Sequence, residues 1–338
     1  MATKKIRLGI NGYGRIGRGV HRQAIESDDI EVVAINSRSE AASHAHLLKY
    51  DSIYGKCRAK IEVLDDNHLK IQGKKVYVHR VKDPKDMDWG EHDVDIVIEC
   101  TGRFTNMKDA KKHLGSGAKN VLITAPCKDK EIPNIVMGVN DEEIDLSKFQ
   151  VLSNASCTTN CLATTLKVLN DHFGVEQAFV TTIHAFTYTQ NLHDNSNPDD
   201  FRRARATTQS IIPTTTGAMK AIGRVIPELE GKIDGMAMRV PVATVSCLDM
   251  SVKVKKGTTV EEVNKMFRKA SRRDLQGILS FTDEPLVSID FKGSKYSSVI
   301  DQLSTKVMDG NFVKVIAWYD NEWAYISRVV DLVRWMCA

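Results

Sequence analysis

The feature that most constrains the fold is a glycine motif close to the N-terminus. Residues 12–17 read Gly-Tyr-Gly-Arg-Ile-Gly. A short apolar run from Lys5 to Asn11 precedes the motif, and Ile16, Val20 and Ala24 follow it at helical spacing. In this order the first glycine makes a tight turn, the second admits a pyrophosphate and the third lets helix and strand pack closely. The segment therefore predicts the strand, turn and helix of a dinucleotide-binding domain.

Further strand-like runs follow this motif in the first half of the chain. They span residues 31–35, 94–99 and 120–124, and a helical segment lies at 106–113. Strands that alternate with helices are typical of a parallel sheet covered on both faces. We therefore expect an α/β fold with a doubly wound, Rossmann-type parallel sheet over residues 1–156. Apolar residues at helical spacing between Trp323 and Met336 predict a terminal helix, and we assign residues 323–338 to the same domain.

The second half of the chain has a different pattern. Alternating apolar and polar residues over 178–183, 236–242, 245–254 and 313–319 predict a mostly antiparallel sheet. Residues 186–205 are polar and lack periodicity, which is typical of a long loop that carries function. A chain of 338 residues exceeds the usual size of one hydrophobic core, so we expect a second, α+β domain over residues 157–322.

Charge and hydropathy narrow the classes of partner. The net charge of +4 is small for this length, and Lys and Arg are interspersed with Asp and Glu rather than gathered in a basic stripe. The densest basic stretch, Lys265–Arg273, follows a Thr259/Glu262 capping pattern and predicts the solvated face of an amphipathic helix. Nucleic acid is therefore not indicated as a partner. No apolar run reaches the length of a membrane span, so no membrane partner is expected.

The N-terminus and the cysteines bear on the compartment. The first residues are charged and lead into a strand-like run, without the apolar segment of a secretory signal. Seven cysteines, an odd number spread from Cys57 to Cys337, do not form a disulfide framework and indicate reduced thiols. We expect a cytoplasmic protein, and a removed plastid leader stays open as an alternative.

The residues after the second strand bear on the choice of cofactor. An acidic residue is expected about 20 residues beyond the glycine motif, where it bonds the ribose hydroxyls of NAD. Here the sequence reads Asn36-Ser37-Arg38, with a hydroxyl and a guanidinium in place of a carboxylate. Such groups tolerate a 2′-phosphate, so the segment favours NADP or at least admits it. The alternative is that Arg38 points to solvent and that NAD is bound through other groups.

The sharpest local signal is the segment Ser-Asn-Ala-Ser-Cys-Thr-Thr-Asn-Cys at residues 153–161. Apolar residues at helical spacing follow it, so Cys157 falls at a helix N-terminus, where the helix dipole favours a reactive thiolate. A metal site is the first alternative, but Cys157 and Cys161 supply two ligands at most and no second Cys/His pair has ligand spacing. We therefore expect no metal. A buried, inert cysteine is the second alternative, and it suits Cys161 better than Cys157.

A thiol nucleophile needs a base that titrates near neutral pH, and histidine is the side chain that does so. His184 stands out among ten histidines because it ends an apolar strand where the long polar loop begins. Its position is equally typical of a structural histidine.

Together these segments resemble the glyceraldehyde-3-phosphate dehydrogenase family along essentially the whole chain. The similar segments are Ile10–Arg18, Ala155–Cys161, Thr181–His184, Ile211–Gly217 and Trp318–Trp323. The resemblance implies phosphorylating oxidation of D-glyceraldehyde 3-phosphate to 1,3-bisphosphoglycerate, reversibly, with NADP or NAD and inorganic phosphate, through a hemithioacetal and a thioester. It also implies a homotetramer. Erythrose-4-phosphate dehydrogenase on the same scaffold and a non-catalytic RNA-binding relative are the alternatives.

The resemblance also assigns roles to residues. It makes Cys157 the nucleophile and His184 its base. Thr187 and Arg239 resemble the site for the substrate's phosphate. The site for the attacking phosphate is similar to Ser156, Thr158, Arg203, Thr216 and Gly217. Cofactor positions from the glycine motif, the second strand and the resemblance are Gly12, Gly14, Arg15, Ile16, Gly17, Asn36, Ser37, Arg38, Lys82, Thr101, Thr124, Ser196, Asn321 and Tyr325.

The sequence departs from the family pattern at a few positions. Ser37 replaces the aspartate common in NAD-specific members, and Asp194-Asn195-Ser196 resembles the serine-bearing loop of the NADP-accepting type. Both departures favour NADP. Val242 stands where a threonine is usual and Cys127 where a serine or lysine is common, and the sequence offers no functional account of either.

Overall fold

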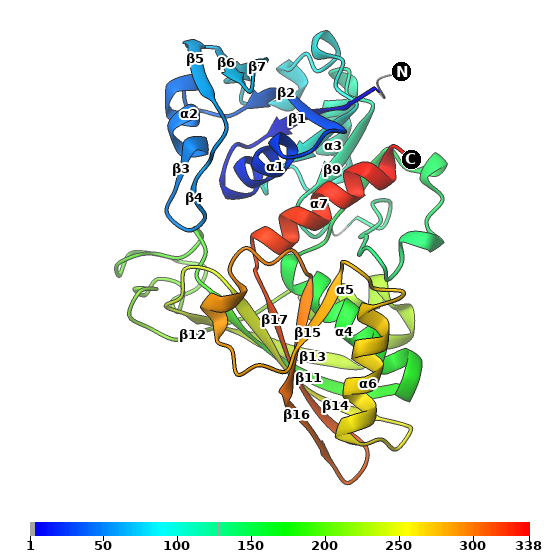
Figure 1. Ribbon diagram of the computed structural model, residues 1–338. Coiled ribbons are helices and arrows are strands. Elements are labelled where there is room, and N and C mark those ends of the chain that lie inside the picture. Colours follow the sequence, from blue (N-terminus) through cyan, green and yellow to red (C-terminus); the bar gives the residue numbers. More distant parts are fainter. Residues whose placement is uncertain (1–3, 128) are drawn as a thin grey trace. The chain divides into compact units, whose positions relative to one another are not determined.

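The computed structural model describes residues 4–127 and 129–338, and contacts within the chain divide it into two units. Among the described residues, the first unit comprises 4–135, 143–155 and 326–338, and the second comprises 136–142 and 156–325 (Figure 1). These boundaries lie at 155/156 and 325/326, close to the expected 156/157 and 322/323. Residues 136–142 group with the second unit, which the sequence pattern does not indicate.

The first unit is built on a mixed sheet whose centre is parallel. Strands β10, β9, β8, β1, β2 and β7 pair in this order and all run parallel, whereas β6 and β5 add an antiparallel hairpin at one edge. The predicted Rossmann-type sheet is confirmed, and the hairpin is an addition to it. The strands are β1 (Ile6–Asn11), β2 (Ile30–Asn36), β5 (Ile61–Asp65), β6 (His68–Ile71), β7 (Lys74–His79), β8 (Ile96–Glu99), β9 (Asn120–Ile123) and β10 (Val151–Ser153).

Helices pack on this sheet, and the C-terminal helix α7 contributes most of its length to the first unit. The predicted terminal helix is confirmed over Trp323–Met336. Gln23 of α1 donates to Ser327 of α7 at 3.0 Å, and Arg334 near the end of α7 forms an ion pair with Asp29 at 2.8 Å. The other elements here are α1 (Arg15–Ile25), α2 (Ala41–Lys49), α3 (Met107–Gly115) and the small ribbon β3 (Tyr50–Asp51) and β4 (Gly55–Lys56).

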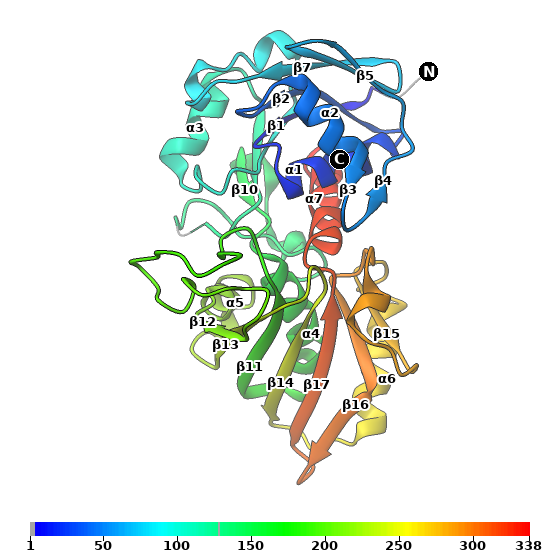
Figure 2. The same cartoon turned by 90° about the vertical axis from the view of Figure 1, so that its left-hand side faces the viewer.

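The second unit is a sheet of seven strands in the order β12, β13, β11, β14, β17, β16 and β15, as Figure 2 shows. Neighbours are antiparallel except for the pairs β11/β13 and β15/β16, so the predicted mostly antiparallel sheet is confirmed. The strands are β11 (Val175–Ala185), β12 (Ile212–Thr214), β13 (Ile233–Val240), β14 (Ser246–Val254), β15 (Leu279–Thr282), β16 (Ser298–Met308) and β17 (Phe312–Tyr319).

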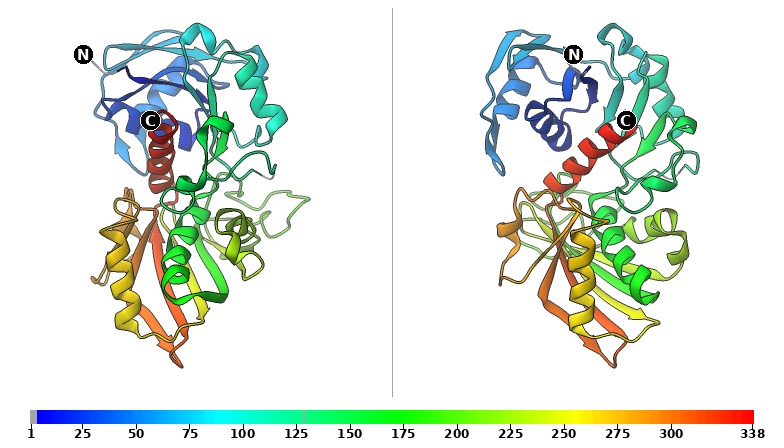
Figure 3. Two further views of the ribbon diagram at one scale, coloured as in Figure 1. Left: turned by 90° about the vertical axis from the view of Figure 1, so that its right-hand side faces the viewer. Right: turned by 45° about the vertical axis from the view of Figure 1, so that its right-hand side comes forward.

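Three helices bury their apolar residues against this sheet: α4 (Cys157–Phe173), α5 (Ala218–Val225) and α6 (Val260–Ser271). Figure 3 shows α4 in green and α6 in yellow beside each other on the sheet. Leu162, Leu166 and Leu169 are fully buried in this core, as their helical spacing predicts. The predicted capping box of α6 is present, with Thr259 and Glu262 each bonding the other's backbone.

The longest loop of the second unit connects β11 to β12. Residues 186–211 form neither helix nor strand, in agreement with the predicted loop. None of the helices in the described part of the chain is long and apolar enough to cross a membrane. Short 3-10 turns occur at Pro84–Asp86, Gly90–His92, Asp141–Glu143, Leu146–Lys148, Pro227–Leu229 and Ser288–Phe291.

Candidate active site

Cys157 is the first residue of α4, as the spacing of the leucines predicts. Ser156 caps the helix: its Oγ accepts a hydrogen bond from the Thr159 amide at 3.0 Å. Ala155 precedes the cap with a φ of 50°, which turns the chain sharply into the helix. The buried leucine face of α4 therefore holds the Cys157 thiol in a fixed place at the helix terminus.

His184 lies next to this thiol. Its Nε2 is 3.6 Å from Cys157 Sγ, close enough for a hydrogen bond that involves sulfur. His184 belongs to β11, and the parallel register with β13 pairs it with Arg239. Arg239 Nη1 consequently lies 2.6 Å from His184 Nδ1 and 3.3 Å from the Ala185 carbonyl oxygen. Helix start and strand register thus bring a thiol, an imidazole and a guanidinium together.

Burial controls the protonation of this group. It raises the pKa of the Cys157 thiol, and the positive charge of Arg239 offsets only part of that effect. Burial, helped by Arg239, lowers the pKa of His184 to about 3. The sequence predicts a thiolate at the helix terminus, but without substrate the structure favours a thiol beside a neutral imidazole. The imidazole is therefore in the neutral form that a general base requires.

Tyr319 connects the elements of the site through its hydroxyl, a role that no sequence motif indicated. Its hydroxyl lies 3.1 Å from Thr158 Oγ1 on α4 and 2.8 Å from Thr182 Oγ1 on β11. Its ring packs edge to face against His184, with centroids 6.1 Å apart. Tyr319 lies within the Trp318–Trp323 segment that resembles the family. The sequence therefore shows the motif, but the contacts of Tyr319 with Thr158 and Thr182 are seen only in the structure.

Apart from Arg239 on β13, the residues assigned to phosphate lie in three places within the second unit. Thr158 Oγ1 lies 3.9 Å from Cys157 Sγ, and Ser156 caps the same helix. Thr216 and Gly217 stand at the N-terminus of α5, where Thr216 Oγ1 accepts from the Ala218 amide. Thr187 and Arg203 belong to the loop 186–211 and bond within it, Thr187 to Thr189 at 2.9 Å and Arg203 to Asp200 at 3.1 Å.

The orientation of the Asn321 amide is set by the sheet of the second unit. The Ala185 amide donates to Ser246 Oγ at 3.0 Å, so the Ser246 hydroxyl is free to donate to Asn321 Oδ1, also at 3.0 Å. Asn321 therefore presents Nδ2 as its donating atom. Ser246 is a second residue of the site that no sequence motif indicated. Tyr325, another predicted cofactor residue of this unit, is buried.

The glycine motif of the first unit fits a pyrophosphate. Gly12 has a φ of 95°, and a Cβ on Gly17 would lie only 2.3 Å from the Gly12 carbonyl oxygen, so a side chain is excluded there. Gly14 is the N-cap of α1 and makes no side-chain cap, and a Cβ built on it meets no atom within 4 Å. The position that a Gly14 side chain would occupy is therefore open, which leaves room for a phosphate to approach the backbone there.

The other predicted cofactor residues of the first unit lie mainly at the carboxyl ends of its strands. Asn36 is buried and bonds Asn11 and Val81, and the Ser37 amide donates to the His79 carbonyl at 3.0 Å. Arg38 and Lys82 are exposed. Arg15 forms an ion pair with Asp51. The remaining residues are Ile16, at the start of α1, and Thr101 and Thr124, which contact Glu99. Ser196 is exposed in the loop 186–211 of the second unit.

The other cysteines form neither a disulfide nor a metal site among the described residues. All seven cysteines lie in the described residues, and none forms a disulfide. Cys161 is buried one turn inside α4, and burial raises its pKa well above the usual value. Within the described ranges, no group of three or more His, Cys, Asp or Glu side chains is placed to hold a metal ion. Cys127, one of the departures from the family pattern, is buried in a small apolar cluster with Val121 and Ile123. An apolar side chain suits this position. The structure gives no reason for Val242.

Comparison with known proteins identifies the family. Residues 6–107 match the family model "Glyceraldehyde 3-phosphate dehydrogenase, NAD binding domain", and residues 156–321 match the corresponding C-terminal domain. The chain is 52% identical to the glyceraldehyde-3-phosphate dehydrogenase of Geobacillus stearothermophilus over 333 residues, 98% of both chains. It is 51% identical to that of Priestia megaterium, again over 98% of both. It is 48% identical to the chloroplastic glyceraldehyde-3-phosphate dehydrogenase A of Chlamydomonas reinhardtii, over 98% of this chain and 89% of the relative. This chain therefore belongs to the glyceraldehyde 3-phosphate dehydrogenase family.

Proposed function

We propose that this chain catalyses the reversible phosphorylating oxidation of D-glyceraldehyde 3-phosphate to 1,3-bisphosphoglycerate with a nicotinamide cofactor. The observation that carries the proposal is the Cys157 Sγ to His184 Nε2 distance of 3.6 Å, with Arg239 against the same imidazole. A nucleophile with its base and a cation for a phosphate are the groups that this reaction needs.

Cys157 is the nucleophile and His184 the base. As Sγ bonds to the aldehyde carbon, the thiol proton passes to His184 Nε2, and the imidazolium then protonates the carbonyl oxygen to give a hemithioacetal. Nε2 next takes the hydroxyl proton while the carbon loses a hydride, which leaves a thioester on Sγ. An oxygen of inorganic phosphate then attacks the thioester carbon and the C–S bond breaks. Sulfur regains its proton from His184, the phosphate proton goes to water, and the acyl phosphate leaves.

Two sets of residues hold the phosphates in this scheme. Arg239 and Thr187 bind the phosphate of the aldehyde. The attacking phosphate takes the groups at the N-termini of α4 and α5 and in the long loop, which are Ser156, Thr158, Arg203, Thr216 and Gly217. Helix N-terminal amides and guanidinium groups are the donors that proteins use for phosphate, which supports this assignment.

The cofactor binds the glycine motif through its pyrophosphate and Asn321 through its nicotinamide amide. When bound, the nicotinamide ring supplies the acceptor for the hydride. The open space at Gly14 and the donating Nδ2 of Asn321 support these two contacts. NADP is accepted at least as well as NAD in this proposal, because Ser37, Arg38 and Ser196 offer donors where a carboxylate would repel the 2′-phosphate.

The assembly we propose is a homotetramer in the cytoplasm. Large apolar side chains are exposed in the long loop, with Tyr188 at 87% and Phe201 at 81% of their full exposure, and a subunit interface would cover them. Seven cysteines without a disulfide support a reducing compartment.

Initial rates test the proposal directly. We expect the full chain to reduce NADP and NAD with glyceraldehyde 3-phosphate only when inorganic phosphate is present, and to use erythrose 4-phosphate poorly. Neither erythrose-4-phosphate dehydrogenase nor a non-catalytic RNA-binding protein is supported by the comparisons. A preference for erythrose 4-phosphate, or cofactor reduction that does not need phosphate, would overturn the proposed reaction.

A further inference from the structure

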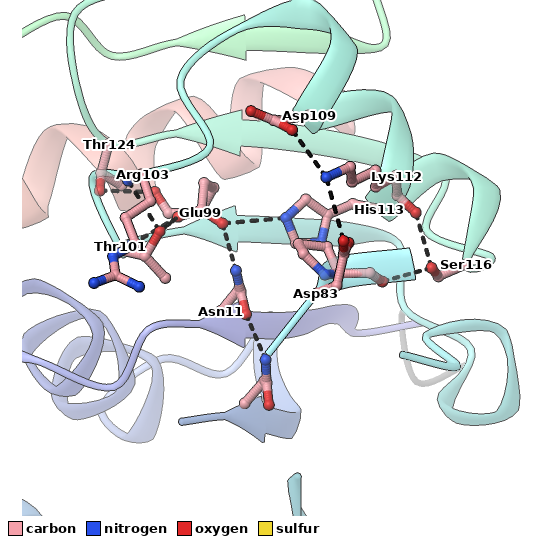
Figure 4. A network of polar contacts seen from close by, with 12 residues as sticks. Asn11, Asp83, Glu99, Thr101, Arg103, Asp109, Lys112, His113, Ser116 and Thr124 are labelled. Carbon is pink, nitrogen blue, oxygen red and sulfur yellow. Dashed lines mark hydrogen bonds and ion pairs between the residues drawn. The ribbon is translucent and has the colours of Figure 1, made fainter. Parts of the chain in front are cut away.

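Glu99, the last residue of β8, carries a carboxylate that the proposed chemistry does not use. It is 1% exposed, and four groups point at its two oxygens (Figure 4). Asn11 Nδ2 lies 2.5 Å and His113 Nε2 3.1 Å from Oε2. The Thr101 amide lies 2.7 Å from Oε1, and the Thr101 hydroxyl bonds the same oxygen. A buried carboxylate needs such donors, because an unpaired buried charge is strongly destabilising.

The backbone beside Asn36 sets the direction of the bonds that reach Glu99 from β1. The Val81 amide donates to Asn36 Oδ1 at 3.0 Å, and Asn36 Nδ2 donates to the Val81 carbonyl at 3.1 Å. Backbone groups cannot exchange roles, so Asn36 Nδ2 also donates to Asn11 Oδ1, at 2.7 Å. Because Asn11 Oδ1 accepts from Asn36, the Nδ2 group of Asn11 faces Glu99 and donates to it. The glutamate oxygen must therefore accept.

The indole of Trp89 sets the direction of the hydrogen bond between His113 and Glu99. An indole N–H only donates, so at 3.1 Å from His113 Nδ1 it makes that nitrogen an acceptor. Neutral His113 then carries its hydrogen on Nε2 and donates it to Glu99. The Thr101 amide is a third donor whose role is fixed. Three groups that can only donate here, Asn11 Nδ2, His113 Nε2 and the Thr101 amide, thus contact one carboxylate.

We propose that Glu99 is a positioning residue for the nicotinamide nucleotide, an inference that rests on the proposed function. Through Asn11 it holds Asn36, the residue before Ser37, at the end of β2. Its other oxygen holds Thr101, two residues beyond the end of β8. Both positions are predicted to contact the cofactor, and both lie at the carboxyl ends of parallel strands, where nucleotides bind in this type of sheet. One buried carboxylate therefore fixes two strand ends of the nucleotide site.

The variant Glu99→Gln tests this role, because an amide keeps the shape but replaces one acceptor by a donor. An NH₂ group at the Oε2 position faces two N–H donors whose polarity is imposed by Val81 and Trp89. An NH₂ group at the Oε1 position faces the Thr101 amide. Either orientation breaks a contact to one of the two strand ends, so the nucleotide site is loosened while Cys157 is left intact.

The measurement is calorimetric binding of NADP and NAD to the full chain without aldehyde, together with steady-state kinetics. We expect Glu99→Gln to weaken nucleotide binding and raise its KM by about tenfold or more, as the loss of a hydrogen bond to a charged group does. We expect kcat at saturating nucleotide to stay within about twofold, since the chemical groups are untouched. Ser116→Ala is the matched control, because it removes two bonds of the buried Ser116 hydroxyl at the end of α3, to Pro84 and Lys112, without contact to Glu99.

A second pair of variants covers the case in which Glu99→Gln does not fold. His113→Leu removes one donor and should weaken nucleotide binding several-fold, whereas His113→Gln keeps an N–H near Nε2 and should restore most of the affinity. Unchanged nucleotide affinity in folded Glu99→Gln, or an equal loss in Ser116→Ala, would overturn the positioning role. A wild-type protein that binds neither nucleotide would instead overturn the proposed function itself, so the two failures are distinct.

Discussion

Arg239 Nη1 lies 2.6 Å from His184 Nδ1, while Nε2 of the same imidazole lies 3.6 Å from Cys157 Sγ. A guanidinium only donates, so this contact makes Nδ1 an acceptor and places the imidazole hydrogen on Nε2. The Ala185 carbonyl, 2.7 Å from Nδ1, requires the opposite tautomer. A substrate phosphate that draws Arg239 away would leave Nδ1 bonded to Ala185 and Nε2 free to accept the thiol proton. In the proposed mechanism, phosphate binding and base formation are thus linked through one nitrogen.

Replacement of Arg239 by Ala should shift the pH dependence of kcat. The Arg239 charge helps to lower the pKa of His184, so its removal raises that pKa from about 3 toward the ordinary value. The base works when neutral and is lost as the pH falls through its pKa. The acid limb of the kcat profile should therefore move to higher pH in the variant.

The same variant should lose its preference for a phosphorylated aldehyde. A charge-assisted contact to phosphate contributes about 1.5–3 kcal/mol, so KM should rise far more for glyceraldehyde 3-phosphate than for glyceraldehyde. Arg202→Ala, which alters an exposed arginine, is the control. An unmoved acid limb together with equal KM changes for the two aldehydes would contradict both roles of Arg239.

His184→Asn should lower kcat by roughly a hundredfold or more, the usual scale for loss of a general base. Cofactor binding should be unchanged, because His184 contacts Cys157 and Arg239, neither of which is assigned to the cofactor. His193→Asn, an exposed change in the long loop, serves as the control. A variant with normal kcat and a normal pH profile would remove His184 from the mechanism.

The sequence is sufficient to predict the elements that carry this chemistry. The glycine motif predicts the turn between β1 and α1, and the terminal helix is found over the predicted Trp323–Met336. Periodicity reports burial along one element, and it is strong in both segments. It does not report which strands pair. The antiparallel hairpin of β5 and β6 and the parallel pair β11/β13 are therefore visible only in the structure.

In the site, too, the sequence predicts single residues, whereas the contacts between distant residues are seen only in the structure. Cys157 and His184 are found by motif and by position at a strand end. The nearness of Arg239 to His184 depends on register between strands that are far apart in sequence, and the hydroxyl of Tyr319 bridges three separate segments. The buried network of Glu99 also joins distant residues, from Asn11 to His113. Such contacts leave no periodic trace in a single sequence.

Tyr319→Phe should destabilise the second unit and disturb the catalytic residues. The change removes hydrogen bonds to Thr158 and Thr182, each worth about 0.5–1.5 kcal/mol, while the ring against His184 stays. We expect a loss of about 1–3 kcal/mol in the free energy of unfolding and a several-fold decrease in kcat. Tyr188→Phe, at an exposed tyrosine, should change neither quantity. Unchanged stability and kcat in Tyr319→Phe would show that the hydroxyl does not organise the site.

Ser37→Asp should shift the cofactor preference from NADP toward NAD. A carboxylate at this position repels the 2′-phosphate and can accept hydrogen bonds from the ribose hydroxyls. The ratio of kcat/KM for NADP to that for NAD should fall by roughly tenfold or more, about 1.4 kcal/mol. Ser39→Asp, two residues away and exposed, is the control for added charge. If wild type prefers NAD by such a factor and Ser37→Asp barely alters NADP use, the proposed preference is wrong.

The most direct test of the central claim is to trap the thioester on Cys157. The enzyme is mixed with glyceraldehyde 3-phosphate and oxidised cofactor without inorganic phosphate, and the acylated peptide is identified by mass spectrometry. We predict one burst of reduced cofactor for each acylated Cys157, discharged when phosphate is added. The control Cys161→Ser, which alters the buried cysteine one turn away, should keep the burst, and Cys157→Ser should lose it because a serine hydroxyl is a far weaker nucleophile. A phosphate-sensitive burst in Cys157→Ser, or acylation at another cysteine, would contradict the account.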